Sequence, residues 1–243
     1  MCRVLFKYLL GVGLFLLSMQ VSAADDSRPS DEVVEIMRAH FPWFTNGKAL
    51  FVDVNEQRMY VMLNEDIIQD FNISSSKYGE GEVPNSMKTP LGLHFVGKKV
   101  GDGAPMNTIF KARGNTGKRA VPNDERYLDK DLITTRIMWL EGGEERNSLG
   151  SKSSMRRYIY IHGTPDEALL GEPASHGCIR MRNIDVYALY EFVEEGTPVV
   201  IWKDGYLEPD VIVDLPEVES DLSKKDRKLA KKRLNKEGRK SRL

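Results

Sequence analysis

Residues 49–73 read ALFVDVNEQRMYVMLNEDIIQDFNI, and this stretch decides the class of fold. Three apolar runs rich in Val, Ile, Phe and Tyr, at 49–54, 58–63 and 67–73, are separated by the short polar segments NEQ and NED. Short runs of β-branched and aromatic residues between polar turns are typical of consecutive antiparallel strands. We therefore predict a β-meander at the start of the folded domain.

The sequence that follows continues the β pattern. Further strands are predicted at 93–96, 107–111, 136–140, 158–162 and 198–202, with loops at 74–90, 97–105, 113–131 and 141–156. One helix is predicted after Asn183 as its N-cap, because apolar residues then recur on one face until Gly196. The sequence predicts a mainly β domain over residues 48–203.

The two ends of the chain differ in composition from this domain. Residues 1–23 begin with basic residues, continue with an apolar stretch too short to span a bilayer, and end in the small residues VSA. We predict a signal peptide at 1–23, a short helical segment within 24–47, and a C-terminal extension at 204–243. An exported chain without a visible wall-sorting signal fits a periplasmic location best.

The net charge of −1 hides a basic tail on an acidic body. Residues 224–243 hold eleven Lys or Arg residues against one Asp and one Glu. Such a tail either contacts an anionic surface, such as wall polymer or lipid headgroups, or stays solvated. Nucleic acid is not an expected partner of an exported protein.

Cysteine usage directs attention to one thiol. Cys2 lies in the predicted signal peptide, so the exported chain keeps only Cys178. Structural cysteines of exported proteins normally come in pairs. A single exported thiol is therefore either buried and inert or held for chemistry.

The residues around this thiol favour chemistry. Cys178 lies in ASHGCIRM, residues 174–181, and YIHGT, residues 160–164, precedes it. A cysteine attacks as its thiolate, and an imidazole with a pKa of about 6.5 can take the proton and return it to the leaving group. We predict Cys178 as the nucleophile and His162 as its base.

Two other readings of these residues stay open. A cysteine with two histidines also suits zinc, although no fourth Cys or His lies nearby in sequence. A buried cysteine beside hydrogen-bonded histidines is the other reading. We predict no metal and no cofactor.

The motif HGT at 162–164, followed by SHGCIRM at 175–181, resembles the signature of the L,D-transpeptidase (YkuD-type) catalytic domain. The resemblance covers about residues 48–203 and implies a YkuD-like mixed β-sandwich with one or two short helices and long loops. It implies action on peptidoglycan stem peptides: Cys178 attacks the carbonyl of the third stem residue, a diamino acid, and expels the terminal D-alanine. The resulting thioester is resolved by an amine.

By matching position, the resemblance also implies roles for the neighbouring residues. The carbonyl of Gly163 would orient the His162 imidazole. The oxyanion site would be shaped by His176, Gly177 and the Cys178 N–H, with Ser175 as a further oxyanion or orienting residue.

Substrate contact is predicted for two residues. Arg180 would hold a substrate carboxylate, and its structural alternative is an ion pair with an acidic neighbour such as Asp185. Tyr160 is the second candidate, although an aromatic residue in a strand more often belongs to the core.

The acyl acceptor is left open by the sequence. An amine of a second stem peptide would give a 3→3 cross-link, a lysine of an envelope lipoprotein would give anchoring, and water would give a carboxypeptidase or amidase. The loops at 97–131 and 141–156 are expected to choose among them. The non-enzymatic alternative is a wall-binding module with an inert thiol.

Overall fold

The structure is a computed structural model that describes residues 30–42, 44, 46–128 and 130–205. The predicted signal peptide at 1–23 and residues 206–243 of the predicted extension lie outside the described residues. Within the described part of the chain, no helix is long and apolar enough to cross a membrane.

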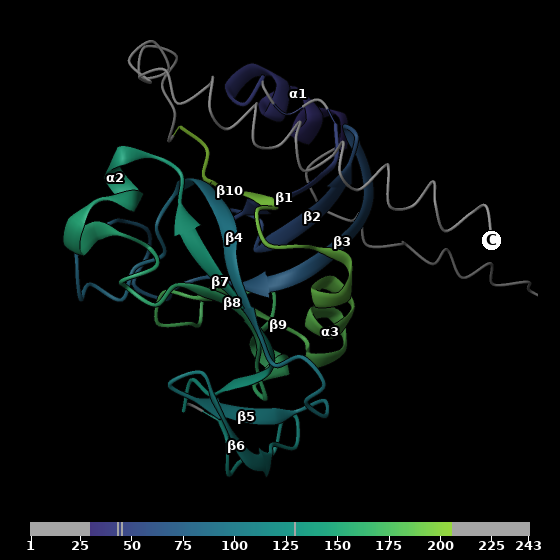
Figure 1. Cartoon of the computed structure of the whole chain (residues 1–243), viewed down its shortest axis with the longest axis vertical. Coiled ribbons are helices and arrows are strands. Elements are labelled where there is room, and N and C mark those ends of the chain that lie inside the picture. Colours follow the sequence, from purple (N-terminus) through teal and green to yellow (C-terminus); the bar gives the residue numbers. More distant parts are fainter. Residues whose placement is uncertain (1–29, 43, 45, 129, 206–243) are drawn as a thin grey trace, which may run out of the picture.

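The described residues form ten strands and three α-helices (Figure 1). The strands are β1 Lys48–Asp53, β2 Arg58–Leu63, β3 Asp66–Ser74, β4 Gly92–Val100, β5 Thr108–Lys111, β6 Gly114–Arg119, β7 Ile133–Gly142, β8 Tyr160–Gly163, β9 Ile179–Met181 and β10 Pro198–Trp202. The helices are α1 Ser30–His40, α2 Glu145–Ser148 and α3 Asn183–Phe192, with short 3-10 helices at Gly150–Lys152 and Glu167–Leu169. The predicted meander is confirmed, because β1 pairs with β2 and β2 with β3, both antiparallel.

Three elements lie where the sequence predicts loops or no strand. Strand β6 is exposed at every position, so it lacks the alternation of apolar and polar residues that marks a half-buried strand. Strand β9 has three residues and helix α2 has four, which is too short for a periodic pattern. Pairing with neighbouring strands, rather than local sequence pattern, decides β6 and β9.

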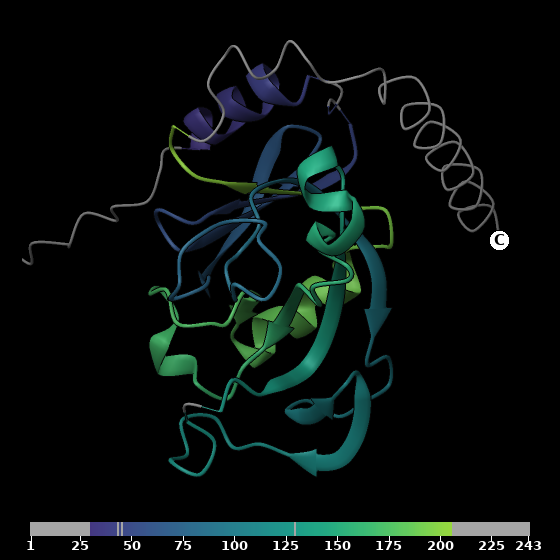
Figure 2. The ribbon, with the colours of Figure 1, turned by 90° about the vertical axis from the view of Figure 1, so that its left-hand side faces the viewer.

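The strands form one mixed sheet that closes on itself. The order is β4-β10-β1-β2-β3-β9-β8-β7, and β7 pairs back with β4. The β1–β10 and β8–β9 pairs are parallel and the others in this ring are antiparallel. The hairpin β5–β6 continues from β7 at one end of the molecule (Figures 1 and 2). The predicted mainly β class is confirmed.

Two apolar clusters hold the ring and its helices together. The larger cluster combines inward-facing residues of eight strands with one face of α3, including Leu50, Ile161, Ile179 and Leu189. The second packs Val33 and Met37 of α1 against strands β1, β2, β4 and β10. Burial of these side chains is the main stabilising contribution to the fold.

Helix α3 starts near the predicted position but with a different cap. Arg182 is the N-cap residue and makes no side-chain capping bond. Asn183 is buried, and its amide nitrogen donates to the carbonyl of Thr164 and to the carboxylate of Glu167. The prediction of Asn183 as N-cap is wrong, because its side chain links the helix to the loop after β8 instead.

Candidate active site

The parallel pair β8–β9 places the two predicted catalytic residues on one face of the sheet. Ile161 pairs with Ile179, and both side chains are fully buried in the main core. Because successive side chains of a strand point to opposite faces, His162 and its partner Arg180 face the other side. Cys178 immediately precedes β9 on that same side. It is one diagonal step from His162, a step of about 7–8 Å between Cα atoms that side chains can bridge.

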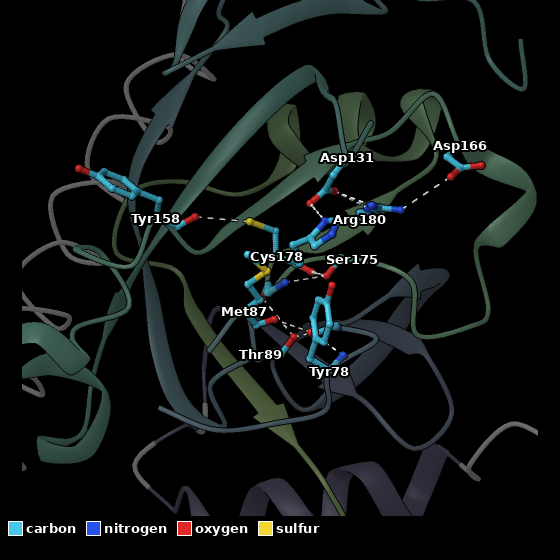
Figure 3. Close-up of polar contacts among 12 residues, drawn as sticks. Tyr78, Met87, Thr89, Asp131, Tyr158, Asp166, Ser175, Cys178 and Arg180 are labelled. Atoms are coloured by element: carbon cyan, nitrogen blue, oxygen red, sulfur yellow. Dashed lines mark hydrogen bonds and ion pairs between the residues drawn. The ribbon is translucent and has the colours of Figure 1, made fainter. Parts of the chain in front are cut away.

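A network of hydrogen bonds fixes the turn at residues 175–178, which we call the Cys178 turn (Figure 3). The Ser175 hydroxyl donates to the Cys178 carbonyl at 2.6 Å and accepts from the Gly177 N–H at 3.1 Å. Thr89 donates to the Gly177 carbonyl at 3.1 Å. Gly177 has φ +121°, a backbone conformation that favours glycine. Ser175 and Gly177 therefore shape this turn, and their role at the oxyanion site stays a prediction.

The thiol of Cys178 is half-buried, and its sulfur donates to the carbonyl of Tyr158 at 3.4 Å (Figure 3). Removal of water by the surrounding protein raises the pKa of Cys178 to about 12, and the charge of Asp131 adds to this. At neutral pH the resting thiol is therefore protonated. Attack as a thiolate requires a neighbouring group that takes the proton.

His162 is held in the form that such a base needs. Its Nδ1 lies 2.8 Å from the Gly163 carbonyl, which confirms the predicted contact between these two residues. Because a carbonyl only accepts, Nδ1 carries the proton, and Nε2 of the neutral ring keeps its lone pair. Burial lowers the pKa of His162, so the ring is neutral at neutral pH.

Glycine is required at position 163 by its surroundings. A Cβ added there would lie 2.8 Å from both Asn183 Oδ1 and the Thr134 carbonyl oxygen. No side chain fits without moving backbone. The residue whose carbonyl orients the imidazole is therefore held close to β7 and α3.

Asp131, in the segment before β7, joins two residues that flank Cys178 (Figure 3). Its Oδ2 accepts from His176 Nδ1 at 2.6 Å, and its Oδ1 accepts from Arg180 Nε at 2.8 Å. Burial alone would raise the pKa of Asp131, but the Arg180 charge, the hydrogen bonds from Arg180 and His176, and the charge that His162 carries when protonated at acidic pH outweigh it and lower that pKa. The carboxylate is therefore ionised at neutral pH.

Sequence reasoning missed Asp131, which has a positive φ of 46° and no local motif around it. Its contacts reach 45 and 49 residues along the chain. Backbone strain of this kind is concentrated at functional sites, but it is visible only in a structure.

Arg180 is almost fully buried and paired within the protein. Besides Asp131, its guanidinium lies 4.0 Å from the Asp166 carboxylate. The predicted alternative partner Asp185 is wrong, because Asp185 pairs with Arg182 at 3.8 Å. Arg180 thus forms ion pairs within the protein, with Asp131 and Asp166. Substrate contact by Arg180 stays a prediction.

Tyr160 packs in the core on the same face as the thiol. Its ring is buried, contacts Trp139 edge-on, and belongs to a small cluster against which Cys178 packs. Its hydroxyl accepts from Arg113 Nη1 at 3.0 Å. The expectation that this aromatic residue belongs to the core is confirmed, and its contact with substrate stays a prediction.

Among the described residues, no group of three or more His, Cys, Asp and Glu side chains is arranged to hold a metal ion. His94 is buried and bonds the Gly92 carbonyl and the Ser154 hydroxyl.

A sequence model of the L,D-transpeptidase catalytic domain, YkuD, matches residues 47–201, more than half of the chain. Two Bacillus subtilis proteins named as L,D-transpeptidases match shorter segments. YqjB is 38% identical over 73 residues, which cover 27% of this chain and 42% of YqjB. YkuD is 45% identical over 49 residues, which cover 20% of this chain and 30% of YkuD. The matches thus span less than half the length of these relatives.

Solved structures show a distant likeness. The L,D-transpeptidase from Xylanimonas cellulosilytica, residues 123–326, is 18% identical, with 65% of this chain and 61% of that chain covered and a TM-score of 0.40. L,D-transpeptidase 3 from Mycobacterium tuberculosis is 16% identical, with the same coverage of 65% and 61% and a TM-score of 0.40.

Proposed function

The chain belongs to the YkuD family of L,D-transpeptidase catalytic domains, and from this premise we propose that it transfers an acyl group of a peptidoglycan stem peptide through Cys178. One observation carries the proposal. Cys178 and His162 lie on one face of the parallel pair β8–β9, and the Gly163 carbonyl holds the imidazole with its Nε2 lone pair available.

The first step is proton transfer from Cys178 to His162. Both groups are neutral at rest, because burial raises the pKa of the thiol and lowers that of the imidazole. When Nε2 takes the thiol proton, the imidazolium keeps its Nδ1–H bond to the Gly163 carbonyl. The nearby Asp131 carboxylate stabilises this positive charge, and it also raises the pKa of the Cys178 thiol, so its two effects on the transfer oppose each other.

Acyl transfer then proceeds through a thioester. The sulfur bonds to the carbonyl carbon of the third stem residue, and the imidazolium returns its proton to the amine of the leaving D-alanine. The oxyanion is assigned to backbone N–H groups at the Cys178 turn. The Gly177 N–H already donates to Ser175, so the Cys178 N–H is the stronger candidate.

The acceptor that resolves the thioester is proposed to be an amine of a second stem, which gives a 3→3 cross-link. A lipoprotein lysine and water are the competing acceptors. The export of the chain to the periplasm and a contact of its basic tail with an anionic surface are part of the same proposal. They agree with a substrate that lies outside the cytoplasmic membrane.

The test is incubation of the protein with tetrapeptide-bearing muropeptides, read by mass spectrometry. We expect D-alanine release and a new dimer, and a loss of at least about a thousandfold in Cys178→Ala, because the nucleophile is gone. Wild-type protein pre-treated with iodoacetamide is the matched chemical control. The family resemblance implies that a carbapenem acylates the same thiol. Absence of any D-alanine release together with no carbapenem adduct on Cys178 would leave only the wall-binding reading.

Product masses identify the acceptor. A dimer indicates a second stem peptide, a tripeptide alone indicates water, and a peptide attached to an added lipoprotein indicates a lysine. A variant lacking residues 222–243 tests the tail, since unchanged pelleting with wall sacculi in low salt would remove its targeting role.

A further inference from the structure

Two arginines near the thiol are committed to partners inside the protein. Arg180 is almost fully buried between Asp131 and Asp166. Arg157 donates from Nη1 to the Gly81 carbonyl at 3.0 Å and from Nη2 to the Lys88 carbonyl at 2.6 Å. A guanidinium used in this way is poorly placed to bind a substrate carboxylate as well, because the new contact would break an existing one.

Arg113 is in a different situation. Its guanidinium lies 4.3 Å from the centre of the Trp139 ring and 5.2 Å from that of Tyr158. One hydrogen bond, from Nη1 to the Tyr160 hydroxyl, fixes its orientation. Among the described residues, no carboxylate pairs with it. The group is thus held in place by aromatic faces while its charge is not neutralised.

The backbone that carries Arg113 is strained. Lys111 pairs with Gly114, so Ala112 and Arg113 form the two-residue turn between β5 and β6. Both have positive φ, 48° and 68°. Turns of this kind favour Asn-Gly, because a residue with a Cβ is strained at positive φ. A large side chain in such a turn points to a use for that side chain.

Two aromatic residues connect Arg113 to the reacting sulfur. The Tyr160 ring, whose hydroxyl it contacts, belongs to the cluster against which Cys178 packs. Tyr158, over whose ring it lies, accepts the hydrogen bond of the Cys178 sulfur through its carbonyl and is 55% exposed. A substrate at the thiol therefore comes within reach of this guanidinium.

We propose that Arg113, rather than Arg180, is the guanidinium that binds a carboxylate of the acyl donor. This inference rests on the proposed function, because it names a subsite for the same substrate. Arg180 is instead a positioning residue, tied to Asp131, for the strand that follows Cys178. The free edge of the Arg113 guanidinium suits a carboxylate through paired, charge-assisted hydrogen bonds.

A first experiment needs no turnover. Cys178 is alkylated with iodoacetate and with iodoacetamide, which differ in charge, and the ratio of the two rates is compared among variants. We expect Arg113→Gln to lower this ratio by about tenfold, as loss of a hydrogen bond to a charged group would. A change in the thiol pKa alters both rates together and cancels in the ratio.

The matched control is Arg119→Gln, which removes another guanidinium from the same hairpin. The Arg119 side chain is exposed and donates to the Met106 carbonyl. We expect its ratio to equal that of the wild type. Tyr160→Phe keeps the Arg113 charge but removes its hydrogen bond, so an intermediate ratio is expected. An Arg113→Gln ratio equal to the wild-type ratio would overturn the proposal.

A second experiment measures binding of tetrapeptides to the Cys178→Ala protein by calorimetry. One peptide has all carboxylates free, one is amidated at the terminal D-alanine, and one is amidated on the diamino acid. Arg113→Gln should weaken binding of the free peptide by about ten- to a hundredfold. The amidation that abolishes this difference identifies the carboxylate that Arg113 binds.

The two proposals fail in different ways. If the wild type releases no D-alanine but prefers iodoacetate through Arg113, the transpeptidase function fails and the anion subsite stands. If D-alanine is released and Arg113→Gln changes neither the alkylation ratio nor peptide binding, the subsite fails and the function stands.

Discussion

The Cys178 turn with strands β8 and β9 is built in the opposite way to the hairpin β5–β6. Around the turn, Ser175, His162 and Arg180 are buried, and each has a polar partner inside the protein. In the hairpin, every residue of β6 is exposed, and Arg113 is held mainly by aromatic faces. The groups proposed to react are thus fixed on a rigid sheet, whereas the residue proposed to recognise the substrate lies on a peripheral hairpin.

The largest effect should come from His162→Gln, which removes the base from the rigid region. We expect the rate of D-alanine release to fall by about 10²- to 10⁴-fold, the usual contribution of general acid–base catalysis. Gln keeps a polar side chain at this buried position, and circular dichroism checks that the fold survives.

The pH profile of the wild type sharpens this prediction. Burial lowers the pKa of His162, so the ring stays neutral down to a pH below about 6.5. Activity should therefore be retained on acidification through 6.5 and be lost only below it, as the base becomes protonated. An acid limb above pH 7 would contradict the neutral resting imidazole.

Asp131→Asn should have the next largest effect and should move two measurements in opposite directions. The Asp131 charge raises the pKa of Cys178, whereas the charges of Arg180 and Arg157 lower it. Removing the carboxylate charge lowers the thiol pKa, so alkylation by iodoacetamide at fixed pH becomes faster. D-alanine release should nevertheless fall by about tenfold or more, because His176 and Arg180 lose their charged partner.

The control for this variant is Asp70→Asn, which breaks the Arg58–Asp70 pair on β2 and β3, at 2.8 Å and partly exposed. We expect neither rate to change there. If Asp131→Asn slowed both alkylation and D-alanine release, a general loss of structure would replace the positioning role.

The smallest effects are expected on the free energy of unfolding, when one glycine from each region is replaced by alanine. Gly177→Ala should lower the free energy of unfolding by about 1–3 kcal/mol, because φ +121° is strained for alanine and the new Cβ would lie 3.4 Å from the Lys88 and Met87 carbonyl oxygens. Gly117→Ala in the hairpin, with φ +71° and nothing within 4 Å, should cost about 1 kcal/mol. Denaturant unfolding measures both.

Activity separates the two glycine variants further. Gly177→Ala should slow D-alanine release, because the turn that carries Cys178 must shift, while Gly117→Ala should leave it near the wild-type rate. Equal loss of activity in both would contradict the contrast between a rigid turn and a tolerant hairpin.

The local sequence by itself determined the mainly β class, the meander and most strands. It also identified Cys178 as the candidate nucleophile and His162 as its candidate base. These features can be predicted from short-range patterns: alternating apolar runs, glycine turns, and residue types that suit thiol chemistry. The contact between His162 and the Gly163 carbonyl was implied by the family resemblance, and it joins adjacent residues.

Only the tertiary structure decided what surrounds the thiol. Asp131 reaches Arg180 across 49 residues, and Arg113 reaches Tyr160 across 47. Each contact depends on the register with which β7 and β5 pair with their neighbours in the sheet. A single charged residue in a loop belongs to no periodic pattern, so its sequence context does not predict that register. For this reason the sequence offered Asp185 only as an alternative partner of Arg180, whereas the fold supplies Asp131 and Asp166.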